Sequence, residues 1–93
     1  MEEWSLVVSG RVQGVFYRAS VLKFVQNEKL NLRGFIKNLS DGRVQVLAQG
    51  ETVELEKLAL FCRQGPPLAQ VEEVQINKSP NGGGKYGEFA IHY

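Results

Sequence analysis

Apolar and polar residues follow two different periods along this chain of 93 residues. Where apolar residues alternate with polar ones, or run together for a few positions, the pattern predicts β-strands. Where they recur at three- and four-residue spacing, it predicts helices with one buried face. The strands are expected at residues 4–9, 32–39, 43–49, 71–76 and 89–93, and the helices at about 17–30 and 52–64.

The first predicted helix has its apolar stripe at Val21, Leu22 and Val25, with Phe24 at the edge of the stripe. The residue Asn31 follows the last apolar position of the pattern. Asparagine tolerates positive φ angles better than most residues do. We therefore expect Asn31 to close this helix in the left-handed conformation.

The second predicted helix places Leu55, Leu58, Ala59 and Cys62 at i, i+3, i+4 and i+7, which is one face of a helix. Cys62 is therefore expected to be a small core residue. A Gly-Pro-Pro sequence at residues 65–67 ends the helix, because proline cannot continue it.

A tight turn is predicted at Ser40-Asp41-Gly42, between two of the strands. The pair Asp-Gly favours the positive φ angles of hairpin turns, so Asp41 is explained by the turn rather than by work as a general base. After the turn, Val44 and Val46 alternate with polar residues, which is typical of a half-buried strand antiparallel to the one before it.

The predicted order is β-α-β-β-α-β, with a short extra strand before or at the end. Two strand-helix-strand halves give an antiparallel sheet with both helices on one face. This is the α+β class and the ferredoxin-like α/β sandwich. The fold alone does not identify a function, because enzymes, metal carriers and RNA-binding proteins share it. The glycine-rich stretch at residues 79–85 is expected to be a mobile loop.

Length and composition narrow the function classes. With 93 residues, we expect one small domain over residues 1–93, and no apolar run approaches the roughly 20 residues of a membrane span. A net charge of +1 gives no electrostatic reason to expect nucleic acid or a membrane surface as partner. The acidic start at residues 1–4 is unlike a signal peptide, and one cysteine excludes an internal disulfide. We expect a cytoplasmic protein, and nothing in the sequence requires more than a monomer.

The candidate chemistry lies at residues 9–18, between the first strand and the first helix. Gly10 and Gly14 permit backbone angles at which successive N–H groups curl around one oxyanion, and the helix dipole favours negative charge there. Arg18 falls in the first helical turn, where the dipole disfavours a cation by roughly a few tenths of a kcal/mol. Such an exception often marks a functional site. The alternative is an exposed arginine beside a glycine turn, and the spacing alone leaves both open.

The sequence Gly-Arg-Val-Gln-Gly-Val-Phe-Tyr-Arg at residues 10–18 resembles the acylphosphatase signature G-x-V-Q-G-V-x-[FY]-R. Residues 34–44 resemble the second block of that family, G-[WYF]-[VI]-x-N-x-x-D-G-x-V. Residues 65–71 resemble its G-P-P-x-A-x-V segment, and residues 89–93 are similar to its closing strand. The resemblance covers nearly the whole chain.

Three departures from the family pattern stand out. The stretch between Arg18 and Asn38 is about two residues longer than usual, so we expect the first helix to extend or bulge, which could change how Arg18 is aimed. Asn31 stands where glycine is common. Tyr17 replaces a more frequent phenylalanine, and we expect its ring to pack.

The resemblance implies hydrolysis of acyl phosphates to a carboxylate and inorganic phosphate. It implies that Arg18 binds the phosphoryl group and that Asn38 orients the attacking water. An acyl phosphate is a mixed anhydride with a good leaving group, so no metal and no cofactor is expected. The backbone N–H groups expected to hold the phosphate oxygens belong to Gln13, Gly14, Val15, Phe16 and Tyr17.

Two residues have other interpretations, and two other function classes remain open. Without the resemblance, Asn38 would be a hairpin-end residue, and His92 is expected to be a surface strand residue rather than a catalytic base. An anion-binding protein without turnover would share the same loop. An RNA-binding sheet finds a weak echo in Arg33-Gly34-Phe35, against neutral charge and missing aromatic residues. Similar domains also occur inside larger maturation proteins, and we expect a free-standing enzyme here.

Overall fold

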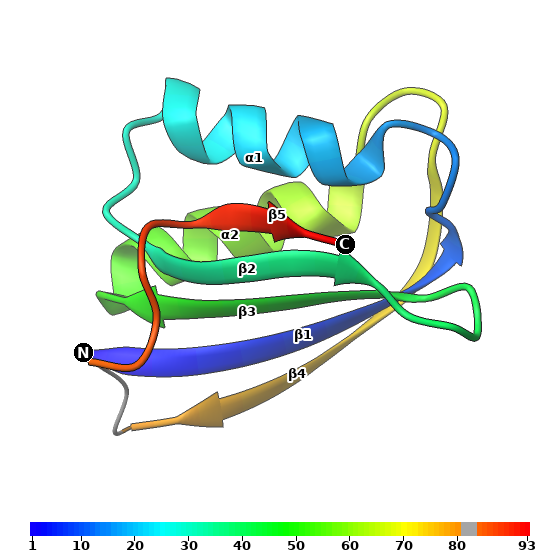
Figure 1. The fold of residues 1–93 in the computed structure, drawn as a ribbon. Helices are drawn as coiled ribbons and strands as arrows, with labels where there is room; N and C mark the ends of the chain where they lie inside the picture. Colours follow the sequence, from blue (N-terminus) through cyan, green and yellow to red (C-terminus); the bar gives the residue numbers. More distant parts are fainter. Residues whose placement is uncertain (81–83) are drawn as a thin grey trace.

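The computed structural model of the protein describes residues 1–80 and 84–93. The chain forms five strands and two helices in the expected order, with the extra strand at the C-terminal end (Figure 1). Their bounds are β1 (Glu2–Arg11), α1 (Tyr17–Asn27), β2 (Arg33–Asn38), β3 (Val44–Gly50), α2 (Thr52–Gln64), β4 (Gln70–Ser79) and β5 (Ala90–His92). The loop predicted at residues 79–85 includes residues 81–83, which lie outside the described part, so its expected mobility stays a prediction.

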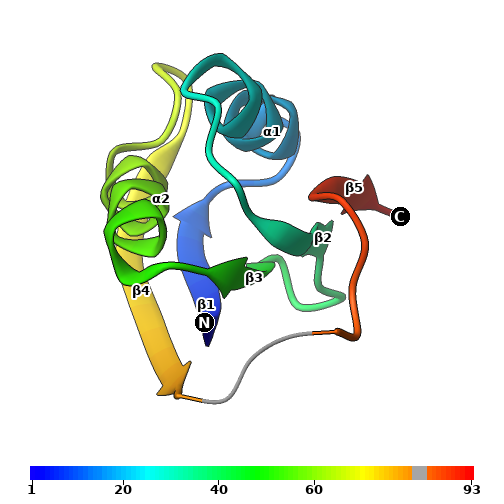
Figure 2. The ribbon, with the colours of Figure 1, turned by 90° about the vertical axis from the view of Figure 1, so that its left-hand side faces the viewer.

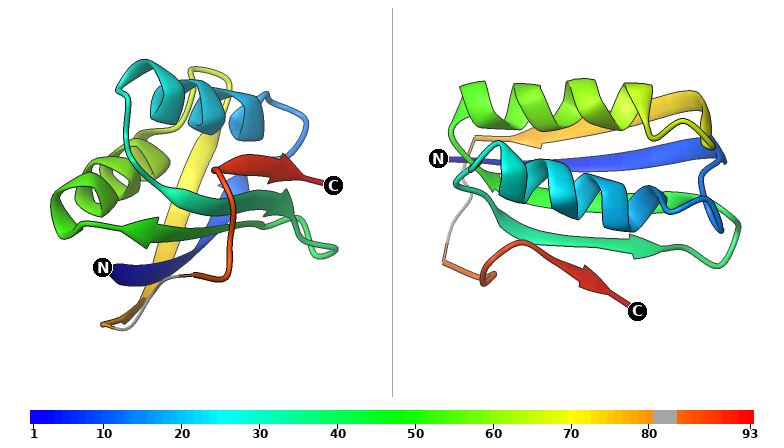
Figure 3. Two further views of the ribbon diagram at one scale, coloured as in Figure 1. Left: turned by 60° about the vertical axis from the view of Figure 1, so that its left-hand side comes forward. Right: turned by 90° about the horizontal axis from the view of Figure 1, so that it is seen from above.

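The five strands form one sheet in the order β4-β1-β3-β2-β5. The first four pair antiparallel, as expected for the ferredoxin-like fold, and β5 pairs parallel with β2 at one edge. Both helices cover the same face of the sheet, which is seen end-on in Figure 2 and from two further sides in Figure 3. The predicted fold class is therefore confirmed, and β5 makes the sheet a mixed one.

The core lies between the sheet and the two helices. Alternate residues of the central strands face the helices, with Leu6 opposite Val46 and Val8 opposite Val44 in the register of β1 and β3. The predicted stripe of α2 is buried against them, and burial raises the pKa of the Cys62 thiol to about 12. Cys62 is thus the core residue that its spacing predicted. Neither helix in the described residues is long and apolar enough to cross a bilayer.

The end of α1 differs from the expectation. The helix stops at Asn27 rather than near Leu30, and the left-handed residue is Lys29, with φ 53°, rather than Asn31. The N–H of Lys29 donates to the carbonyl of Gln26, and the N–H of Leu30 donates to the carbonyl of Val25. This is the Schellman arrangement, in which an apolar residue after the helix packs on its last turn. Burial of Leu30 against the core thus places the left-handed residue two positions before Asn31.

Tyr17 connects the start of α1 to the end of α2. Its side chain is 1% exposed, and its hydroxyl donates to the carbonyl oxygen of Cys62 at 2.7 Å. In a continuing helix that carbonyl would accept from residue 66, but Pro66 has no N–H. The tyrosine hydroxyl therefore satisfies a carbonyl that the proline leaves without a donor. The packing expected for Tyr17 is present, and the hydrogen bond adds a reason for tyrosine in place of phenylalanine.

Gly34 in β2 is required by the close approach of β3. Its φ is +135°, and a Cβ added there would clash with the carbonyl oxygen of Leu47. That oxygen belongs to backbone, so the clash cannot be relieved by a side-chain rotation. Gly42 in the hairpin turn also has a positive φ, +94°, but a Cβ there would meet open space.

The Tyr17 hydrogen bond predicts that removal of the hydroxyl destabilises the protein even when the aromatic ring is kept. Tyr17→Phe should lower the free energy of unfolding by about 1–2 kcal/mol, because a buried carbonyl loses its donor. Urea unfolding followed by circular dichroism measures this. Tyr93→Phe is the matched control: its side chain is 98% exposed, so the change should stay within about 0.5 kcal/mol. Equal losses in the two variants would contradict the prediction.

The two glycines predict a large and a small effect of the same substitution. Gly34→Ala should destabilise the protein by at least about 3 kcal/mol, through both the positive φ and the clash with strand β3. Gly42→Ala meets only the conformational penalty, of about 1 kcal/mol. Urea midpoints of the two variants test the difference, and a Gly34→Ala protein as stable as Gly42→Ala would show that β3 can move away.

Candidate active site

The chain leaves the sheet through a bulge at the end of β1. The register of β1 against β4 shifts between Ser9 and Gly10. Gly10 has φ +122°, and a Cβ there would clash with the backbone of Gln70 and Glu72. Glycine therefore lets β1 stay paired with β4 to Arg11 while the following residues turn toward α1.

The turn from β1 to α1 uses two left-handed residues, Gly14 with φ 73° and Phe16 with φ 63°. Between them Val15 is buried, and after them Tyr17 is buried, so alternate side chains anchor the loop in the core. The helix starts without a side-chain cap at Phe16 and without an acidic residue in its first turn. From Gln13 to Tyr17, the backbone N–H groups have no hydrogen-bond acceptor among residues 1–80 and 84–93. This helix start is thus a set of free donors with a favourable dipole.

The side chain of Gln13 holds this loop against the β2–β3 hairpin. Its Nε2 donates to the carbonyl oxygens of Leu39 at 2.8 Å and Arg43 at 2.9 Å. Leu39 directly follows Asn38, so the amide fixes the free donors relative to Asn38. In the same hairpin, the Asp41 carboxylate accepts from the Arg43 backbone and side chain, which adds to the turn role expected for this residue. These hydrogen bonds from Arg43 hold the pKa of Asp41 below its usual value.

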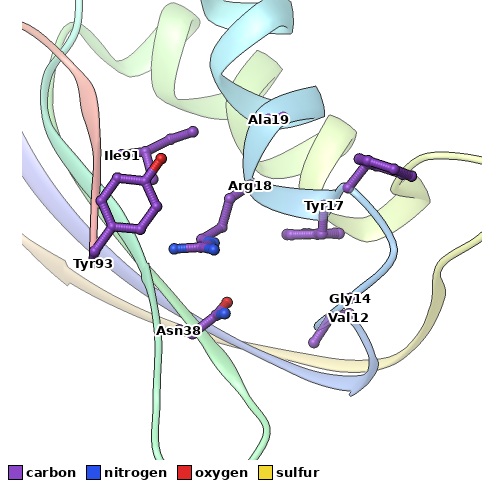
Figure 4. Close-up of a pocket in the computed structure, with 9 residues that line it drawn as sticks. Val12, Gly14, Tyr17, Arg18, Ala19, Asn38, Ile91 and Tyr93 are labelled. Atoms are coloured by element: carbon purple, nitrogen blue, oxygen red, sulfur yellow. The ribbon is translucent and has the colours of Figure 1, made fainter.

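A cavity of about 280 Å³ opens between the loop, the end of β2 and the C-terminus. Its lining residues are Val12, Gly14, Phe16, Tyr17, Arg18, Ala19, Asn38, Ile91 and Tyr93. The side chains of Arg18 and Asn38 point toward one another across this space, and the Tyr93 ring lies beside Arg18 (Figure 4). Arg18 donates from Nη1 to the carbonyl oxygen of His92 at 3.3 Å, and its guanidinium lies 4.9 Å from the centre of the Tyr93 ring. The C-terminal residues therefore hold the arginine over the cavity.

The structure brings together most of the residues that the sequence predicted for the site. Arg18 and Asn38 are 20 positions apart and line one cavity, as do three of the five loop residues. The other two, Gln13 and Val15, have side chains committed elsewhere, one to the hairpin carbonyls and one to the core. Only their backbone N–H groups are available to a ligand.

Tyr93 and Ile91 are cavity residues that sequence reasoning did not assign to the site. They arrive because β5 pairs parallel with β2, with His92 opposite Lys37, which carries the chain end past Asn38. Local patterns do not encode which edge a short strand joins, so this placement had no sequence signal. His92 is exposed, as expected, and its ring stacks on Phe35 at 4.8 Å between ring centres. Its carbonyl rather than its imidazole contacts Arg18.

The titratable groups at the cavity are few. The described residues that line it include no carboxylate side chain and no imidazole. Burial raises the pKa of the Tyr17 hydroxyl, which is already donated to Cys62, so this group stays protonated. In residues 1–80 and 84–93, no three His, Cys, Asp or Glu side chains come close enough to hold a metal ion. Arg18 and the free N–H donors can bind an anion, and the Asn38 amide can orient a neutral molecule such as water.

Comparison with known proteins identifies the family of the chain. The acylphosphatase family model matches residues 4–91. An acylphosphatase from Marinobacter nauticus is 44% identical over 80 residues, which is 86% of this chain and 85% of the relative. One from Methylococcus capsulatus is 40% identical over 91 residues, 98% of this chain and 96% of the relative. The crystal structure of acylphosphatase from Bacillus subtilis superposes with a TM-score of 0.90 at 32% identity, over 100% of both chains. The chain belongs to the acylphosphatase family, whose members are hydrolases that act on acid anhydrides.

Proposed function

We propose that the protein hydrolyses the carboxyl–phosphate bond of acyl phosphates by cradling the phosphate and positioning a water, without a metal or cofactor. The observation that carries this proposal is the shared cavity of Arg18, Asn38 and the free donors at the start of α1. The substrate is a small molecule, and we take the protein to act as a cytoplasmic monomer of one domain.

The phosphate end of the substrate is matched by positive charge and donors. Arg18 offers a planar fork of N–H groups, of which one is used on the His92 carbonyl and the others remain for phosphate oxygens. The N–H groups from Gln13 to Tyr17 add donors at the positive end of the helix dipole. Because the fold already fixes these groups, little reorganisation is needed as charge shifts during the reaction.

Asn38 is proposed to orient the attacking water. Its amide both donates and accepts hydrogen bonds without a change of protonation state. In the reaction the water oxygen forms a new bond to phosphorus, and the bond from phosphorus to the carboxylate oxygen breaks with its electrons on the carboxylate. Both protons of the water end on the phosphate, giving R–COO⁻ and H₂PO₄⁻ from R–CO–O–PO₃²⁻ and H₂O. Since the described cavity residues offer no carboxylate or imidazole side chain as a base, we assign a phosphate oxygen as the proton acceptor.

An anion-binding protein without turnover is the second candidate. It would use the same loop and the same arginine, and saturable phosphate binding without hydrolysis would identify it. The placement of Asn38 beside Arg18 favours the enzyme, because an amide that accepts as well as donates can hold a water next to a bound phosphate, which anion binding alone does not require.

The proposal predicts how two substitutions change hydrolysis of benzoyl phosphate in excess chelator. Asn38→Ala should lower kcat by on the order of 10²–10³-fold, because it removes one positioned group. Arg18→Gln should lower kcat/KM further and weaken competitive inhibition by inorganic phosphate, because it removes a whole charge from the phosphate site. Turnover by the wild type should be the same with and without chelator, and heavy-oxygen water should label the phosphate product rather than the carboxylate.

The matched control is Arg63→Gln, since Arg63 is exposed on the last turn of α2 and lies outside the cavity. It should keep wild-type turnover. Circular dichroism and urea midpoints establish that each variant is folded. A folded wild type without turnover would leave the anion-binding protein, and an Arg18→Gln enzyme as active as the wild type would refute the assigned role.

A further inference from the structure

Phe16 has a backbone conformation that disfavours its own side chain. Its φ of 63° and ψ of 23° lie in the left-handed region, which costs a bulky residue on the order of 1 kcal/mol or more. Lys29 is the other non-glycine residue with positive φ in the described part of the chain, and it closes a helix. Asparagine or glycine would adopt the Phe16 conformation with less strain.

The environment of Phe16 does not compensate for this strain. The side chain is 74% exposed, so little apolar surface is removed from water. It also occupies the N-cap of α1, where Ser, Asp or Asn would accept from the helix N–H groups and contribute about 1 kcal/mol. Conformation, exposure and capping thus all disfavour phenylalanine here. A strained residue that contributes no compensating stability is an argument for a role in ligand binding.

The position of the exposed aromatic rings points to the same role. Among the described residues, the large apolar side chains that are exposed include two aromatic ones, Phe16 and Tyr93. Both line the cavity that holds Arg18 and Asn38. The exposed aliphatic side chains Val53, Leu60 and Leu68 do not line it.

A substrate held by its phosphate must place its acyl group elsewhere in the same cavity. Arg18, Asn38 and the free N–H groups are polar and suit the phosphate and a water, whereas an apolar part of the wall includes Ile91 with the two rings. The volume of about 280 Å³ lies just below the range of about 300–1,000 Å³ for small-molecule pockets, so it suits a small phosphate ester or anhydride rather than a large ligand.

We propose that Phe16 and Tyr93 form a subsite for the acyl group, which selects acyl phosphates with aromatic or extended apolar acyl groups over acetyl phosphate. This inference rests on the proposed hydrolysis and names its substrate class. Packing of the acyl group against the exposed rings removes apolar surface from water on the ligand and on the protein, and an acetyl group offers little such surface.

The test compares kcat/KM for benzoyl phosphate and for acetyl phosphate in the wild type and in Phe16→Asn. Asparagine keeps the backbone N–H and suits the left-handed conformation while it removes the ring. The ratio of the two kcat/KM values should fall on the order of tenfold in Phe16→Asn and in Tyr93→Ser. Phe16→Tyr keeps an aromatic ring and should keep the wild-type ratio. Leu60→Asn, at an exposed position outside the cavity, should also leave the ratio unchanged.

Two further measurements separate this inference from a structural role and from the proposed hydrolysis. A structural role predicts a lower urea midpoint for Phe16→Asn, whereas relief of backbone strain predicts an equal or higher one. The binding of benzylphosphonate and methylphosphonate, which are not hydrolysed, reports the subsite whether or not the protein turns over. A preference for benzylphosphonate that Phe16→Asn abolishes supports the subsite. If the wild type binds the two phosphonates equally, or if Phe16→Asn changes both substrates by the same factor, the subsite is refuted.

Discussion

The side-chain amide of Gln13 holds together the two parts of the chain that make up the site. One part is the loop between β1 and α1, which carries the free donors and Arg18. The other is the β2–β3 hairpin, which carries Asn38. The amide donates two hydrogen bonds to hairpin carbonyls, so both polar hydrogens of one side chain are used on backbone that cannot rotate away. Catalysis by positioning depends on such fixed distances, because an error of about 1 Å in a reacting group has a large effect on rate.

The start of α1 lacks several features that stabilise a helix N-terminus. It lacks a capping side chain, it has no acidic residue in the first turn, and it places Arg18 near the positive end of the dipole. Buried side chains on both sides of the strained Phe16 hold the segment in place: Val15 before it and Tyr17 after it are almost fully inaccessible. The Tyr17 hydroxyl adds a bond to the end of α2, where Pro66 leaves a carbonyl without a donor. The core therefore maintains a helix start that its own sequence would not favour.

The sequence predicted those features that depend on local periodicity or on a complete motif. The bounds of α2 are as expected, because its stripe and the Gly-Pro-Pro stop are both local. The residues Arg18 and Asn38 were identified by resemblance, and the structure places them at one cavity. The predicted end of α1 was wrong. The left-handed residue is set by burial of Leu30, a tertiary effect, and not by the preference of Asn31 for positive φ. Tyr93 was missed because its position follows from a parallel edge strand of only three residues.

These environments divide the cavity into two ends with different physical supports. At the proposed phosphate end, each group is held by a contact with the rest of the fold: the loop by its buried side chains, the hairpin by Gln13, and Arg18 by the carbonyl of His92. At the other end, the rings of Phe16 and Tyr93 are exposed and make no comparable contribution to the core. Substitution of a buried anchor such as Val15 or Tyr17 disturbs the packing that holds the loop, whereas substitution of the exposed rings leaves the core packing intact. The architecture thus separates the part of the cavity that we propose to position water and phosphate, which is held by the fold, from the exposed part that we propose to contact the acyl group.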